Sequence, residues 1–217
     1  MNKKVVAALF AVGITGALAL SGCGPRTETA KVTTGQTDAE VAFRMDMRRL
    51  WEDHVVWTRL VTLGVVDTTG GLDNATNKLV GNSGEMAALF EKYYGKVKGG
   101  RVGSLFSEHT SLTTDIVKAT KAGDAPKAAE GEKKWRENAD KLASRLLDLN
   151  PEWSKIDLKA MWRDHLDFTK AEFEARANKD YAGDVKAFDA VRSQALDMAD
   201  VLSNGIVKQF PRDFGRK

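Results

Sequence analysis

The sequence predicts an all-α protein, a six-helix antiparallel bundle built from three similar αα-hairpins. Three observations support this fold class. From Ala39 onward, apolar residues recur at spacings of three and four, and the breaks in this pattern fall at Gly, Asn and Asp. One nine-residue motif occurs three times at nearly equal intervals. No segment shows the alternation of polar and apolar residues that is typical of a β-strand.

The breaks in the apolar pattern define six predicted helices. Their expected extents are 39–66, 73–94, 101–122, 125–148, 152–178 and 182–208. Because every separator is short, consecutive helices are expected to lie antiparallel. Pro126 and Pro151 fall in the first turns of their helices, after the N-cap candidates Asp124 and Asn150. Pro211 is expected to end the last helix.

The N-terminal residues predict export and a lipid anchor. Lys3 and Lys4 precede an apolar run over 5–20 that is shorter than the roughly 20 residues needed to span a bilayer core. The run ends in Leu20-Ser21-Gly22-Cys23, the pattern of a bacterial lipobox, and a signal anchor with an incidental cysteine is the alternative. We therefore predict a signal peptide over 1–22, lipidation of Cys23, a polar tether over 23–38 and a helical domain over 39–217.

This organisation places the domain in the cell envelope. It would be anchored to the outer face of the cytoplasmic membrane or to the outer membrane, with the membrane as its first expected partner. The chain contains a single cysteine, so no internal disulfide is expected. Without Lys3 and Lys4, the formal net charge of +3 falls to +1. Nucleic-acid binders carry a clustered basic excess, so nucleic acid is not an expected partner.

One short segment is locally basic. The segment Lys92–Arg101 combines two tyrosines with four cations at a helix turn. It could contact anionic lipid or a cell-wall polymer, and the alternative is a solvated charged loop.

The strongest internal signal surrounds the three histidines of the chain. His54, His109 and His165 occupy the same frame: Leu or Met, an aromatic residue, any residue, an acid, His, two residues of any type, a bulky apolar residue and Thr. The histidines are separated by 55 and then 56 residues. This interval equals one helix pair, so each histidine is expected to begin a hairpin.

Helical geometry predicts that the three imidazoles point into the core. Positions −4, −3, +3 and +4 share the face of the histidine, and in this motif they are apolar or Thr. The acid that precedes each histidine is expected at the flank of the helix. The same argument predicts six core residues, namely Trp51, Trp57, Phe106, Leu112, Trp162 and Phe168.

Two interpretations of this buried polar layer follow. In the structural one, each histidine hydrogen-bonds to a side chain on the second helix of its hairpin, which satisfies a buried polar group. The candidate partners are Asn82, Asn138, Asp140, Asp197 and Asp200.

The second interpretation is a metal site in the bundle core. The three histidines, with one or more flanking acids, would hold a divalent ion between facing helices. The acids are Asp53, Glu108, Asp164 and Asp200. The di-iron pattern of Glu three residues before His is absent, because aromatic residues occupy that position. A non-covalent haem held by a histidine and one of Met86, Met161 or Met198 is a further alternative.

No motif in the chain predicts catalysis. The segment 95–103 lacks the strand and the Lys-Ser/Thr of a phosphate-binding loop, and there is neither a Gly-x-Ser-x-Gly elbow nor a Cys-x-x-Cys-His motif. No catalytic residue and no definite cofactor are therefore predicted. The expected function is a non-enzymatic binding or structural module of the envelope, with metal binding as the alternative.

Several segments resemble a family of small exported all-helical bacterial proteins of unassigned function. They are LWEDHVVWTR at 50–59, YYG at 93–95, WRENAD at 135–140, HLDFT at 165–169 and MADVLSNGIVKQFP at 198–211. The resemblance implies export and a helical fold, and it implies no activity. The chain departs from it at 81–84 (GNSG), where an irregularity of the second helix is expected.

Overall fold

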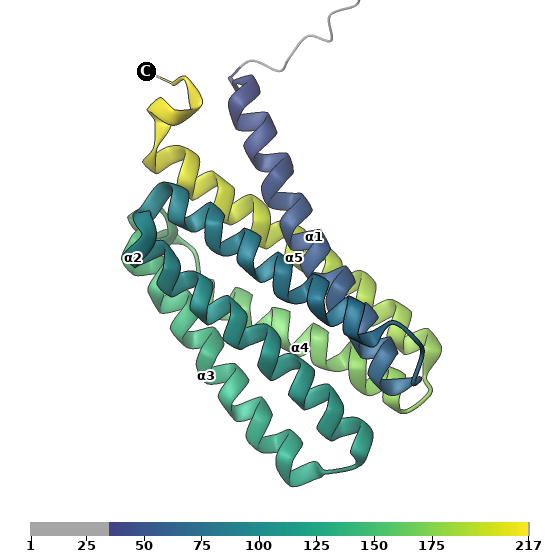
Figure 1. Ribbon diagram of the computed structural model, residues 1–217. Coiled ribbons are helices and arrows are strands. Elements are labelled where there is room, and N and C mark those ends of the chain that lie inside the picture. Colours follow the sequence, from purple (N-terminus) through teal and green to yellow (C-terminus); the bar gives the residue numbers. More distant parts are fainter. Residues whose placement is uncertain (1–34, 217) are drawn as a thin grey trace, which may run out of the picture. The chain divides into compact units, whose positions relative to one another are not determined.

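The computed structural model describes residues 35–216, and these residues form an all-α domain without strands. The predicted all-α fold class is confirmed. The five α-helices, shown in Figure 1, are α1 (Asp38–Val66), α2 (Leu72–Ala122), α3 (Ala125–Leu149), α4 (Leu158–Ala177) and α5 (Tyr181–Gln209). Two short 3₁₀-helices, η1 (Pro151–Lys155) and η2 (Pro211–Phe214), follow α3 and α5. The predicted signal peptide, Cys23 and most of the tether lie outside the described residues.

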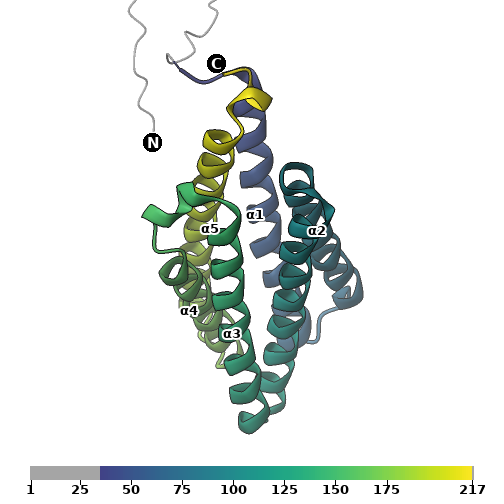
Figure 2. The same cartoon turned by 90° about the vertical axis from the view of Figure 1, so that its left-hand side faces the viewer.

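Helix α2 replaces two of the predicted helices and is the largest correction. Only Gly95 leaves the helical region, with φ 75° and ψ 161°, so the loop expected over 95–100 does not form. The chain nevertheless reverses there, as Figures 1 and 2 show. Ser83 Oγ lies 3.4 Å from Thr110 Oγ1, and a Cβ added at Gly99 would lie 2.5 Å from Glu91 Cα. The two halves of α2 therefore pack against each other, and glycine permits both the positive φ and the close approach.

Two further boundaries differ from the predictions. The helix expected over 152–178 is divided, because Asn150 caps η1 and Asp157 caps α4 by accepting a hydrogen bond from Ala160 N at 2.9 Å. The irregularity expected at 81–84 is absent, since this segment is helical. The N-cap predicted at Asp124 is confirmed by its bond to Lys127 N at 3.1 Å.

The core contains three of the six predicted residues as fully buried side chains, Trp51, Phe106 and Trp162. The prediction was wrong for Phe168, which is 37% exposed, while Trp57 and Leu112 are only partly buried. All three occupy position +3 of the motif. The residues at position +1, Val55, Thr110 and Leu166, are buried instead.

The rotation per residue explains this difference. At 100° per residue, positions −3, +1 and +4 lie on one side of the histidine and position +3 lies on the other. The buried stripe is thus centred beside the histidine rather than on it. The histidines sit within the stripe, and the +3 residues form its edge.

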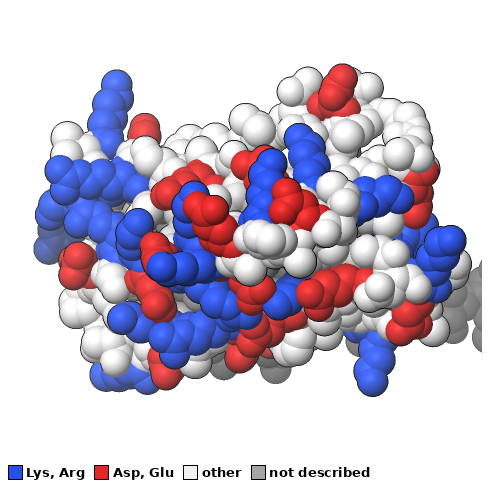
Figure 3. All heavy atoms as spheres, turned by 90° about the horizontal axis from the view of Figure 1, so that it is seen from below, with Lys and Arg blue, Asp and Glu red and all other residues white. Residues whose placement is uncertain are grey.

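Charged residues cover the outside of the bundle and also form one internal cluster. Basic and acidic side chains are intermingled over the face in Figure 3. Inside, Arg59 Nη1 lies 2.7 Å from both Glu172 Oε1 and Asp184 Oδ1, and Arg176 joins Asp184 to Asp67. We call these five residues the charged cluster. Among the described residues, no helix is long and apolar enough to cross a membrane.

Candidate metal centre

The three histidines of the repeated motif meet in the centre of the bundle. His54, His109 and His165 come from α1, α2 and α4, and each is at most 5% exposed. One ring nitrogen from each lies within 4.8 Å of the other two. The ring centroids are 5.7–6.1 Å apart. Residues that are 55 and 56 positions apart in the sequence therefore face one small volume.

An aromatic triangle closes this volume on one side. Trp51, Phe106 and Trp162 occupy position −3 of the three motifs, and their ring centroids are 5.8–5.9 Å apart. The Trp51 ring meets the His165 ring edge-on at 6.0 Å. Apolar walls of this kind exclude water and strengthen the electrostatic interactions within the site.

Side-chain amides orient two of the imidazoles. His109 Nδ1 lies 3.3 Å from Asn138 Oδ1, and His165 Nδ1 lies 3.0 Å from Gln194 Oε1. The amide orientation follows from its second bond: Asn138 Nδ2 donates to Leu105 O at 3.1 Å, and Gln194 Nε2 donates to Met161 O at 2.8 Å. The amide oxygens must therefore accept from the imidazoles, which places the proton on Nδ1. Nε2 is left unprotonated with a lone pair, the form in which histidine binds metals.

His54 has an equivalent amide, Asn82, on its second helix, but no hydrogen bond joins the two side chains. Asn82 Nδ2 donates to Leu50 O at 2.9 Å, as Asn138 and Gln194 do to the equivalent carbonyls of their hairpins. Asn82 Oδ1 and His54 Nδ1 are both buried and have no hydrogen-bond partner among the described residues. Each such group costs about 1–3 kcal/mol when it is unsatisfied.

Burial keeps the three imidazoles uncharged. It lowers the pKa of His54 to about 3, with a further contribution from His165, and the pKa of His165 to about 4. Burial and the two neighbouring imidazoles also hold the pKa of His109 well below its usual value. At neutral pH the cluster thus offers neutral imidazoles, which suit zinc, copper, iron or nickel ions.

One contact competes with metal binding. Trp135 Nε1 donates to His109 Nε2 at 3.3 Å, which is beyond the usual range for a strong N–H···N bond. A tetrahedral ion with bonds of 2.0–2.1 Å would need nitrogens roughly 3.4 Å apart. The imidazoles would therefore move inward by less than about 1 Å and give up this long bond.

The acids proposed as ligands do not enter the cluster. Asp53 pairs with Arg49 at 3.0 Å, Asp140 with Arg163 at 3.4 Å and Asp200 with Arg48 at 2.5 Å, all at the surface. Glu108 and Asp164 are exposed, as expected for the flank of a helix. Glu108 contributes indirectly, because its carboxylate accepts from Asn138 Nδ2 at 2.9 Å.

Among the described residues, only Asn138 of the candidate partners on the second helices bonds to a histidine, and Asn82 bonds instead to the carbonyl of Leu50. The sequence interpretation missed Gln194 and Trp135. A signal for Gln194 exists in the chain, because Asn82, Asn138 and Gln194 are each 56 residues apart, close to the interval of the histidines. Met86 and Met198, considered as haem ligands, are buried in the apolar core.

Comparisons with known proteins give no relative. No family model, no curated protein and no solved structure matches the chain. The resemblance to exported helical proteins therefore stays a prediction.

Proposed function

We propose that this protein is a metal-binding helical module that holds one first-row transition ion with His54, His109 and His165. The observation that carries the proposal is the convergence of three buried ring nitrogens within 4.8 Å of one another. Zinc or copper would suit a site made of imidazoles alone. The fourth position of a tetrahedral ion would be open to a small ligand.

The electrostatics of the cluster support a cation. The Nδ1 atoms of His109 and His165 are committed as donors to amide oxygens, so the Nε2 atoms of these two imidazoles carry lone pairs and no proton. Facing lone pairs repel each other in an apolar enclosure, and Trp135 supplies a donor to only one of them. A bound cation would satisfy all three at once.

We also propose that the domain is a threefold repeat of αα-hairpins, formed by α1 with the first half of α2, the second half of α2 with α3, and α4 with α5. The hydrogen bonds support this division. In each unit an amide lies 28 or 29 residues after the histidine and donates to the carbonyl four residues before that histidine. The repeat would explain how a chain with few histidines brings all of them to one point.

A second candidate is a purely structural polar layer, in which the histidines only satisfy neighbouring groups. The bond from Trp135 to His109 favours it, because it occupies a nitrogen that a metal would need. The two candidates differ in their response to metal ions. If the histidines form only a structural layer, the protein is a non-enzymatic structural module with no ligand in its core.

Thermal unfolding distinguishes the two. We expect zinc or copper to raise the melting temperature of the wild type, with a stabilisation of about 2.7 kcal/mol at 100 times the dissociation constant. His54→Leu, His109→Leu and His165→Leu should each lose this increment. An unchanged melting curve with metal and with chelator, and no metal in the isolated protein by elemental analysis, would leave the structural layer as the function.

We further propose that the module is held at the outer face of a membrane by a lipid on Cys23. The lipobox at 20–23 and the polar segment that follows it support this location. Cys23→Ala should abolish acylation and yield an uncleaved precursor or a soluble product. If this variant partitions with membranes as the wild type does after washing, the anchor lies elsewhere.

A further inference from the structure

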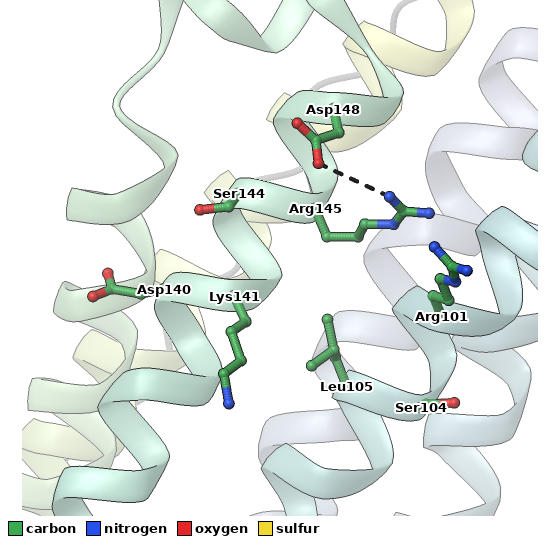
Figure 4. Close-up of a pocket in the computed structure, with 8 residues that line it drawn as sticks. All are labelled: Arg101, Ser104, Leu105, Asp140, Lys141, Ser144, Arg145 and Asp148. Atoms are coloured by element: carbon green, nitrogen blue, oxygen red, sulfur yellow. Dashed lines mark ion pairs between the residues drawn. The ribbon is translucent and has the colours of Figure 1, made fainter.

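A groove on the surface of the bundle gathers three positive charges. It lies between the second half of α2 and α3, has a volume of about 620 Å³, and is shown in Figure 4. Arg101 from α2 and Lys141 and Arg145 from α3 line it, and we call it the cationic groove. Leu105 contributes an apolar side chain, and Asp140 and Asp148 also line the groove.

The cations of this groove are poorly neutralised. Arg145 is 22% exposed, its Nε is buried without a hydrogen-bond partner, and its ion pair with the largely exposed Asp148 is long, at 3.9 Å. Within residues 35–216, Arg101 and Lys141 form no ion pair. Figure 4 shows the guanidinium groups of Arg101 and Arg145 directed toward the same space, while Asp140 points away. Two facing guanidinium groups repel each other unless an anion lies between them.

The equivalent groove of the first hairpin is different and serves as an internal comparison. It lies between α1 and the first half of α2, with a volume of about 350 Å³. Counting back by 55 or 56 residues, Asp46, Glu85 and Leu89 occupy the positions of Arg101, Lys141 and Arg145. In that groove Arg49 pairs with Glu85 at 3.2 Å. The same architecture therefore carries balanced charge in one hairpin and a positive excess in the next.

We propose that the cationic groove binds the phosphoryl group of an organic phosphate. Guanidinium groups match phosphate oxygens with two parallel hydrogen bonds, and Lys141 adds a third positive charge. The volume exceeds what a single phosphate needs and lies within the range of small-molecule sites. The organic part would lie on Leu105 and on the aliphatic stems of the arginines. This inference does not depend on the metal site.

The test is isothermal titration calorimetry of the full-length protein with two soluble probes. One is glycerol 3-phosphate, and the other is dihexanoyl phosphatidylglycerol below its micellar concentration, with dihexanoyl phosphatidylcholine as its control. Binding of glycerol 3-phosphate identifies a soluble phosphate ester as the ligand. Binding of the phosphatidylglycerol alone identifies a lipid headgroup.

Matched variants separate a site from general electrostatic attraction. Arg101→Gln and Arg145→Gln should each weaken binding about tenfold or more, because each removes a charge-assisted hydrogen-bond donor. Arg49→Gln changes the net charge equally but lies in the balanced groove, so it should leave the affinity unchanged. Because Arg101 is exposed, its variant tests the site without disturbing the core. Absence of saturable binding to either anionic probe, or an equal loss in Arg49→Gln, would overturn the proposal.

Discussion

The bundle contains two buried polar clusters that are built in opposite ways. The charged cluster joins Arg59 to Glu172 and Asp184, so its positive and negative groups satisfy one another. The histidine cluster is neutral; amides outside it bond to His109 and His165, and one ring nitrogen of each of the three histidines faces the other two. A cluster whose charged groups satisfy one another can stabilise a fold without a ligand. A cluster that directs unused lone pairs at one point is suited to a ligand.

The two clusters also respond to pH in opposite directions. Burial raises the pKa of Glu172 to about 7 although Arg59 opposes this, so the folded protein binds a proton there more readily than the unfolded chain does. Burial lowers the pKa values of the histidines, so they bind protons more readily in the unfolded chain.

The largest effect is expected from removing Arg59. Arg59→Leu leaves the buried Glu172 without its ion-pair partner and Asp184 with Arg176 alone, and should lower the free energy of unfolding by about 3–5 kcal/mol. Urea denaturation measures this loss. Arg49→Leu, which removes exposed ion pairs with Asp53 and Glu85, is the control and should cost no more than about 1 kcal/mol. A comparable loss in both variants would contradict the distinction between buried and exposed pairs.

Acidification should produce the next largest effect. The three histidines have pKa values of about 6.5 in the unfolded chain and lower values in the folded protein. Between pH 7 and pH 5.5 their protonation in the unfolded chain should therefore lower the free energy of unfolding by about 3–4 kcal/mol. Glu172 offsets about 1–2 kcal/mol of this, because its carboxyl group, which is protonated more readily in the folded protein, becomes more fully protonated over the same range. We expect a net loss of about 2 kcal/mol in denaturation measured with chelator present.

Glu172→Gln provides the control for that measurement. It removes the offset, so its loss between pH 7 and pH 5.5 should be larger than that of the wild type. If the stability of Glu172→Gln rises as the pH falls, the histidines are not neutral in the folded protein.

The amides should have the smallest effect on stability and a measurable effect on metal affinity. Asn138→Leu should lower the affinity for zinc by about 10- to 100-fold, because it releases His109 from its orienting bond. Asn82→Leu tests whether the equivalent amide orients His54 when the ion is bound. Competition with a chromophoric chelator measures the affinity. Ser83→Ala alters a buried polar residue that contacts no histidine and should leave the affinity unchanged. An unchanged affinity in Asn82→Leu alone would show that His54 does not use this amide.

The repeated motif predicted much of this arrangement. The period of the histidines placed them on equivalent helices, and the helical face placed them inward. The sequence could not show that the three helices cross at one level, because this depends on how α1, α2 and α4 pack. The prediction of a loop near Gly95 was wrong for a local reason, because a single residue with positive φ reverses the chain.

The partners of the histidines were harder to predict than the histidines themselves. Acids on the second helices were as plausible as amides, but Asp140 and Asp200 lie at the surface with arginine partners. The carbonyl bonds of Asn82, Asn138 and Gln194 depend on tertiary packing. Only the 56-residue spacing of these amides was visible in the chain. The cationic groove was not predicted from the sequence: of its cations only Arg101 belongs to the basic segment noted there, and Lys141 and Arg145 come from another helix.

X-ray absorption spectroscopy of the zinc-loaded protein identifies the ligands of the bound ion. We expect one ion per chain, with three imidazole nitrogens at about 2.0 Å and a fourth light ligand. His109→Leu should lose one imidazole from this spectrum or fail to retain the ion. A spectrum dominated by oxygen ligands without imidazole scattering, or the same spectrum in the variant, would contradict a metal centre formed by His54, His109 and His165.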